Sequence, residues 1–138
     1  MKSNVAKICS AVLCVSIIMS LFCILGSGEN IFKDSGEKLT YISNYGGNID
    51  KGLLSTTVNA YIEGKTSVTS VKIKMELQKL SSGDYSTVKT WEQTFSGRNG
   101  SMEESKLTNP FSTYRLKATF TAYSGSNSET KTLYVNAS

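Results

Sequence analysis

The sequence predicts an all-β protein, an antiparallel β-sandwich of six to seven strands, with a small barrel as the alternative. Three observations lead to this prediction. Through the middle and late parts of the chain, apolar and polar residues alternate with a period of two, the pattern of a half-buried strand. Turns rich in glycine, serine and asparagine separate these stretches at spacings of roughly 8–14 residues. No stretch after residue 28 has the period of a helix.

Residues 1–28 have the three-part layout of a signal peptide. Lys2 and Lys7 form a basic head, an apolar run follows from Ile8 to Leu25, and small residues end the segment. We expect a signal helix here, with cleavage after Gly28. The mature protein is then secreted or held on the extracellular cell surface.

The apolar run leaves two other interpretations open. Its length is close to the ~20 residues that cross a bilayer as a helix, which also fits an uncleaved membrane anchor. The lysines would then stay inside and the remainder of the chain outside. Lipid attachment at Cys23 is less favoured, because the bulky Phe22 directly precedes it. In every case the folded part faces the exterior, and contact with a membrane is expected only through this segment.

Composition excludes most catalytic and metal-binding chemistry from the mature chain. The protein has no histidine, and its three cysteines all lie in the first 28 residues. Serine and threonine therefore lack an imidazole base, and metal ions lack their commonest ligands. Without Lys2 and Lys7, the fifteen basic residues fall to thirteen against eleven acidic ones, a net charge of +2. This charge is too small to predict binding to nucleic acid, and we expect no enzyme activity, cofactor or metal.

Residues 29–52 are polar and contain several glycines, so we expect a flexible leader there. The Asn44–Asn48 segment consists largely of turn-forming residues and is interpreted as a loop or spacer. One short strand is expected near Leu39–Ile42. The sandwich domain is then expected to occupy residues 53–138.

Two regular strands open the expected domain. In the first, Val58, Ala60 and Ile62 alternate with Asn59 and Tyr61. The second is the clearest stretch of the chain, and its alternating apolar residues are Val71, Ile73, Met75 and Leu77. Such alternation places the apolar side chains in the core and the charged ones in solvent.

A hairpin is expected to follow these strands. Residues 81–84 have the composition of a turn, and residues 85–95 read as the returning strand. Its odd-numbered phase is expected to face the core, because that phase carries Tyr85, Trp91 and Phe95.

The Asn99-Gly100 pair predicts the next hairpin turn, and residues 101–107 are expected to form a polar edge strand.

Glu103 and Glu104 are the only adjacent acidic pair in the sequence. Neighbouring strand residues point to opposite faces, so these two cannot act together as acid and base. They are expected to be solvated and to discourage strand addition at the edge.

Two further strands complete the expected sandwich, at residues 112–123 and 129–136. The first has an apolar face made of Tyr114, Leu116, Ala118, Phe120 and Ala122. The second contributes Leu133 and Val135. All the strands are joined by short turns, which favours antiparallel sheets stacked face to face.

One segment carries a leucine, a proline and then a tyrosine ahead of alternating apolar residues: Leu107, Pro110, Tyr114, Leu116 and Ala118. It resembles the segment of fibronectin type III and related immunoglobulin-like domains that leads into their penultimate strand. In those domains the tyrosine hydroxyl bonds back to the upstream backbone. The resemblance covers about 12 residues well and the strand order of the domain loosely. Leu107 lies one residue further away than usual, and Trp91 falls in the fourth strand segment and not in an early one. The resemblance implies an immunoglobulin-like sandwich.

The chain also resembles uncharacterised small exported proteins of Gram-positive bacteria, in the stretches LQKLSSGDYSTVKTW and YRLKATFTAYSG. This resemblance implies an external location and a fold, and it implies no activity.

Exposed tyrosines are one candidate for a binding site. Tyr61 and Tyr123 fall on the polar phase of their strands, so we expect their rings on a sheet surface. Tyr85 and Tyr134 are further candidates for exposure, which for Tyr85 is the alternative to a place in the core. Such rings can stack on the sugars of a cell-wall glycan or anchor a surface protein. Tyrosine is also common on strands for reasons of propensity alone, which is the simpler interpretation.

A basic stripe is the second candidate, and it consists of Lys72, Lys74, Arg115 and Lys117. If the two strands that carry it are neighbours, the four cations share a face that suits teichoic acid or another polyanion. Glu63 and Glu76 dilute this charge, and solvated strand faces rich in lysine are ordinary.

These features together predict a non-enzymatic exported module that binds a partner at the cell surface or has a structural role there. A small secreted antagonist, such as a bacteriocin-like toxin, is the alternative, because size and export fit it equally well. The sequence identifies neither a ligand nor an oligomeric state.

Overall fold

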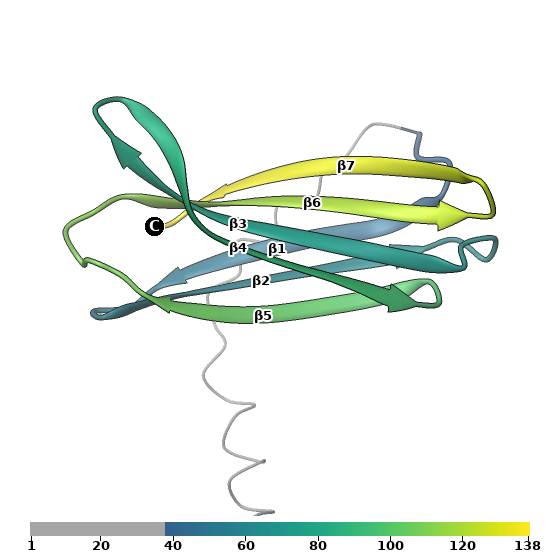
Figure 1. Cartoon of the computed structure of the whole chain (residues 1–138), viewed down its shortest axis with the longest axis horizontal. Helices are drawn as coiled ribbons and strands as arrows, with labels where there is room; N and C mark the ends of the chain where they lie inside the picture. Colours follow the sequence, from purple (N-terminus) through teal and green to yellow (C-terminus); the bar gives the residue numbers. More distant parts are fainter. Residues whose placement is uncertain (1–37) are drawn as a thin grey trace, which may run out of the picture.

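The two-residue alternation of the sequence produces seven strands in the computed structural model, which describes residues 38–138 (Figure 1). In chain order the strands are β1 Ile42–Lys51, β2 Ser55–Gly64, β3 Ser70–Ser81, β4 Asp84–Ser96, β5 Asn99–Leu107, β6 Tyr114–Ser124 and β7 Asn127–Asn136. The expected signal helix lies outside the described residues.

The strands form two antiparallel sheets, which confirms the all-β prediction. One sheet has the order β1-β2-β5 and the other the order β4-β3-β6-β7. Three hairpins, β1–β2, β3–β4 and β6–β7, stay within a sheet, and the remaining connections cross from one sheet to the other. In Figure 1, β6 and β7 lie above β2 and β5, and β3 and β4 of one sheet pass across β1 of the other.

The inner faces of both sheets meet in one apolar core. The predicted apolar faces of β2, β3 and β6 all point into it, and its fully buried members include Val58, Val71, Ile73, Met75, Leu77, Leu116 and Phe120. The rings of Tyr45 and Phe120 pack across the core with their centroids 5.2 Å apart. Each large side chain buried in this way stabilises the fold by roughly 1.5–3 kcal/mol.

The Asn44–Asn48 segment forms part of strand β1, so the sequence prediction of a loop there is wrong. That segment pairs with β2, and Ile42 and Tyr45 on β1 are buried in the core. Its glycines permit close packing, since a Cβ on Gly46 would lie 2.6 Å from a ring carbon of Tyr61. The described sandwich therefore starts at residue 42, within the stretch that was expected to be a leader.

A β-bulge in the β3–β4 hairpin changes the face to which β4 points. The register shifts just after Leu77, and Val88 is left without a paired residue. In the part of β4 that follows the bulge, Trp91 and Phe95 are half-buried and pack against the core, as predicted. On the other side of the bulge Tyr85 lies over an arginine of the outer face, so the prediction that it faces the core is wrong.

Strand β5 lies at an edge of the three-stranded sheet, as predicted. The side chain of Glu103 is exposed and that of Glu104 is half-buried, in keeping with the alternation along a strand. The two carboxylates therefore belong to opposite faces of β5.

Tyr114 holds the loop that joins β5 to β6. Its side chain is buried, and its hydroxyl accepts a hydrogen bond from the N–H of Asn109 at 3.2 Å. The Asn109 side chain in turn accepts a bond from the N–H of Phe111 at 2.8 Å. A bond from this tyrosine to the upstream backbone is what the resemblance to fibronectin type III domains implied. Leu107, the first residue of that motif, is instead exposed.

Strand β1 begins beside Glu129 of β7. The two carboxylate oxygens of Glu129 accept hydrogen bonds from three successive backbone N–H groups, those of Thr40, Tyr41 and Ile42, at 2.7–2.9 Å. Burial alone would raise the pKa of Glu129. The three backbone bonds and the charge of Lys131 outweigh it, and the pKa is lowered.

The two ends of the sandwich carry different elements. The start of β1 lies at one end, beside the β2–β3 connection, where the N–H of Lys65 bonds to the carbonyl of Tyr41. At the other end, on the left of Figure 1, lie the β1–β2 turn, the β5–β6 loop and the C-terminus.

Candidate functional site

The two candidate tyrosines do not share a surface. Tyr61 belongs to the outer face of the three-stranded sheet and Tyr123 to that of the four-stranded sheet, and both are half-buried. They therefore cannot form one platform for a single ligand on one monomer.

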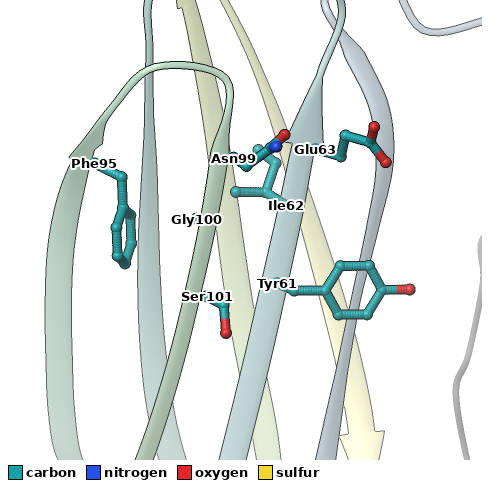
Figure 2. A pocket seen from close by; sticks show the side chains of 7 residues that line it. All are labelled: Tyr61, Ile62, Glu63, Phe95, Asn99, Gly100 and Ser101. Carbon is teal, nitrogen blue, oxygen red and sulfur yellow. The ribbon is translucent and has the colours of Figure 1, made fainter.

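Tyr61 borders a shallow hollow at the end of β5, which is also lined by Ile62, Glu63, Phe95, Asn99, Gly100 and Ser101 (Figure 2). The side chains do not converge on a common point. Figure 2 shows the ring of Phe95 on one side of β5 and the ring of Tyr61 beyond β2, pointing away. The Phe95 ring lies so close to Gly100 that an added Cβ would be 2.5 Å from it. The polar side chains that line the hollow are therefore not gathered around one position.

The four residues of the basic stripe share one face of a sheet. Strands β3 and β6 are neighbours in the four-stranded sheet, so Lys72, Lys74, Arg115 and Lys117 all lie on its outer surface. A shared basic face was expected from the sequence if the two strands were neighbours, and they are neighbours.

The three lysines of the stripe are paired with glutamates, however. Lys72 lies 3.4 Å from a carboxylate oxygen of Glu92 on β4. Glu76 lies between the other two, with an oxygen 3.2 Å from the ammonium of Lys117 and 3.9 Å from that of Lys74. Two carboxylates thus offset much of the charge of the three lysines, which lowers the positive potential that these lysines offer to a polyanion.

Arg115 differs from the lysines because its neighbours are aromatic. Its guanidinium carbon lies 3.8 Å from the ring centroid of Tyr85 and 4.7 Å from that of Tyr134. Its Nε donates a hydrogen bond to the Gln78 side chain at 2.8 Å. The sequence pattern did not predict that Arg115 lies between these two tyrosines.

The end of the sandwich opposite the start of β1 carries most of the exposed apolar surface. Among the described residues, six large hydrophobic side chains are exposed, and four of these lie at this end: Leu53 (83% exposed), Leu54 (73%), Leu107 (79%) and Phe111 (95%). We call these four residues the apolar end. Leu107 is the last residue of β5, and the other three lie on the two loops next to it. Four such residues close together are unusual for a surface that contacts only water.

Hydrogen bonds join the two loops of the apolar end into one unit. The N–H of Thr108 donates to the carbonyl of Leu54 at 3.0 Å, and the hydroxyls of Thr56 and Thr108 lie 2.8 Å apart. The ammonium of Lys51 donates to the carbonyl of Ser112 at 2.7 Å. The apolar side chains are therefore carried by loops that are cross-linked before any partner arrives, which lowers the entropic cost of binding.

The sequence contained a signal for the apolar end that periodicity does not detect. Leu53 and Leu54 follow Gly52 in a turn, and Phe111 follows Pro110 in a loop. Large apolar residues at turn positions have no core to enter, so they point to function more than those on strands do.

Between residues 38 and 138, no three acidic, cysteine or histidine side chains lie close enough together to hold a metal ion. None of the described residues forms a helix that is long and apolar enough to cross a membrane.

No known protein family matches the chain, and no curated protein is significantly similar to it. The fold and the surfaces described above are therefore the basis for inferring what the protein does.

Proposed function

We propose that this chain is an exported, non-enzymatic binding module with an immunoglobulin-like sandwich, and that it docks onto a surface protein through its apolar end. The observation that carries the proposal is the gathering of Leu53, Leu54, Leu107 and Phe111, each at least 73% exposed, on two cross-linked loops and the last residue of β5 beside them. Binding through loops at one end of a rigid sandwich is a common use of such scaffolds.

The strand order supports the immunoglobulin-like part of the proposal. Strands β1, β2 and β5 facing β4, β3, β6 and β7 give a three-on-four arrangement with connections that cross between sheets. The bond from the Tyr114 hydroxyl to the N–H of Asn109 agrees with the same class. Export rests on the signal-like layout of residues 1–28.

The chemistry of the apolar end favours a protein over the other expected partners. Leucine offers no hydrogen bond to a sugar hydroxyl and no charge to a teichoic acid phosphate. Full burial of one such side chain is worth roughly 1.5–3 kcal/mol, so two or three of them can offset much of the cost of association. A hydrophobic recess on a surface protein matches these properties best.

The proposal is tested with the protein purified in its exported form and a paired variant, Leu54→Ser with Phe111→Ser. The protein is immobilised and offered the solubilised surface proteins, the peptidoglycan and the teichoic acid of the cells that export it. We expect saturable binding of a protein, weakened about 100-fold or more by the paired variant because two buried side chains are lost.

Val88→Ser is the matched control, because Val88 is an exposed hydrophobic residue (38%) on β4 that is not one of the four residues of the apolar end. It should bind like the unaltered protein. Equal loss of binding in both variants, or binding of glycan alone that neither variant changes, contradicts the proposal. Inhibition of neighbouring strains that the paired variant abolishes would instead favour the antagonist.

A further inference from the structure

Arg115 is the member of the basic stripe that has no carboxylate partner within residues 38–138. Each of the three lysines has a glutamate oxygen within 3.9 Å. The arginine side chain makes a single hydrogen bond among the described residues, through Nε, so both terminal nitrogens have no protein acceptor there. A guanidinium presents its donors as a fork, and in this case the outer part of the fork is open.

Two tyrosine rings restrict where this guanidinium can lie. Strand β6, which carries Arg115, lies between β3 and β7 in the sheet, so Tyr134 reaches it from the β7 side and Tyr85 from the β3–β4 hairpin. Tyr85 reaches the outer face because the bulge at Val88 reverses the facing of the turn-proximal part of β4. Both rings attract the cation through their faces and shield it from part of the solvent.

A relay of hydrogen bonds orients the guanidinium further. Gln78 accepts the bond from Nε of Arg115 and donates its own amide to the Thr87 hydroxyl at 3.1 Å. Thr87 donates to Glu76 at 3.2 Å, and the second oxygen of Glu76 is held by Lys117. The Gln78 amide is thereby kept with its oxygen toward Arg115. Such a relay places the arginine before any ligand arrives and lowers the entropic cost of binding.

We propose that Arg115, flanked by Tyr85 and Tyr134, is a binding site for an oxyanion, either a carboxylate or a phosphate group on a larger molecule. The terminal nitrogens match the two oxygens of such a group in a bidentate pair, and their partly desolvated setting strengthens that pair. The hydroxyls of both tyrosines also make no hydrogen bond among the described residues, which leaves them available to the same ligand. The site is separate from the apolar end and does not depend on it.

The test is a titration of the 15N-labelled exported protein with sodium acetate and with inorganic phosphate, at constant ionic strength set by sodium chloride. The Nε–H signal of Arg115 and the ring signals of Tyr85 and Tyr134 are followed by NMR. We expect saturable shifts at these signals in the millimolar range of added anion. Tighter binding of phosphate points to a phosphate polymer as the source, and tighter binding of acetate points to a protein carboxylate.

Two variants distinguish anion binding at the preorganised Arg115 site from non-specific attraction of anions to positive charge. Arg115→Lys keeps the charge and loses the fork, so we expect its affinity for either anion to fall at least about fivefold, since a single ammonium cannot make the bidentate pair. Lys72→Gln removes a lysine already paired with Glu92 and should leave the affinity unchanged. Signals of the core strands serve as the check on folding.

Shifts that rise linearly with both anions without saturation overturn the proposal, as does an equal loss of affinity in the Lys72→Gln variant. If Arg115→Lys does not fold, Tyr134→Leu replaces it. That variant keeps the whole guanidinium and removes one flanking ring, and unchanged anion affinity in it rules out the flanked site. None of these outcomes bears on the apolar end, so the two proposals can fail independently.

Discussion

Glu129 on the last strand holds the backbone of Ile42 at the start of the first one, with the N–H of Ile42 2.8 Å from a carboxylate oxygen. Together with the bonds from Thr40 and Tyr41, this carboxylate ties the beginning of β1 to β7, in the opposite sheet. Because the bonds favour the ionised form, the pKa of Glu129 is lowered.

The first prediction concerns the pH dependence of this contact. A carboxylate with a lowered pKa in the folded state stabilises the protein above its ordinary pKa, and the stabilisation is lost as the pH falls through the folded-state pKa. We expect Glu129→Gln to reduce the free energy of unfolding by about 1–2 kcal/mol at pH 7, a value discounted for partial exposure. The difference from the unaltered protein should shrink below the ordinary carboxyl value of 4.5. Urea unfolding at several pH values measures it, and a difference that stays constant down to pH 2 would argue against the contact.

The second prediction concerns Tyr114. Tyr114→Phe removes the acceptor of the Asn109 N–H and leaves that group without its partner in a partly buried position. We expect a loss of about 1 kcal/mol in the free energy of unfolding, measured by urea denaturation. Tyr123→Phe is the matched control, because the Tyr123 hydroxyl makes no hydrogen bond among the described residues. Similar effects from both changes would show that the bond contributes nothing.

The third prediction concerns the core between the sheets. Phe120 is fully buried and packs against Tyr45, so Phe120→Ala should destabilise the protein by about 3–5 kcal/mol through lost burial and the cavity that remains. The midpoint of thermal unfolding, followed by circular dichroism, measures this effect. Val88→Ala changes an exposed residue and should shift the midpoint little. A small shift from Phe120→Ala would mean that the two sheets do not pack as described.

The fourth prediction concerns the contact of Phe95 with Gly100 across the edges of the two sheets. An alanine at Gly100 places its Cβ 2.5 Å from the Phe95 ring, so the ring must move. We expect Gly100→Ala to cost about 1–3 kcal/mol in the unaltered protein and close to nothing when Phe95 is already alanine. A double-mutant cycle of unfolding free energies measures the coupling, and additive effects would contradict the contact.

The strands that could be predicted are those in which apolar and polar residues alternate regularly along the sequence. Strands β2, β3 and β6 have one apolar and one polar face, and the structure places those faces as expected. Strand β1 could not be predicted because its centre contains Gly46 and Gly47, which look like turn residues. Their lack of a side chain is needed for a different reason, the close approach of Tyr61 and Leu116, and this depends on strands distant in the sequence.

The candidate site was predicted in part for a similar reason. Alternation placed the basic stripe on one polar face, and adjacency of β3 and β6 brought its four members together. The pairing of its lysines with Glu76 and Glu92 depends on the register between strands, which periodicity does not give. The facing of Tyr85 depends on a bulge with no local signal in the sequence.

The direction of β1 has a consequence for how far the protein reaches. The strand begins at one end of the sandwich and its ten residues run to the other, a distance of about 33 Å. If the chain is fastened to a cell through residues ahead of β1, Leu53 and Phe111 lie at the end of the sandwich that is farther from the attachment. The domain then acts as a spacer that holds the apolar end away from the surface of its own cell and presents it to neighbouring molecules.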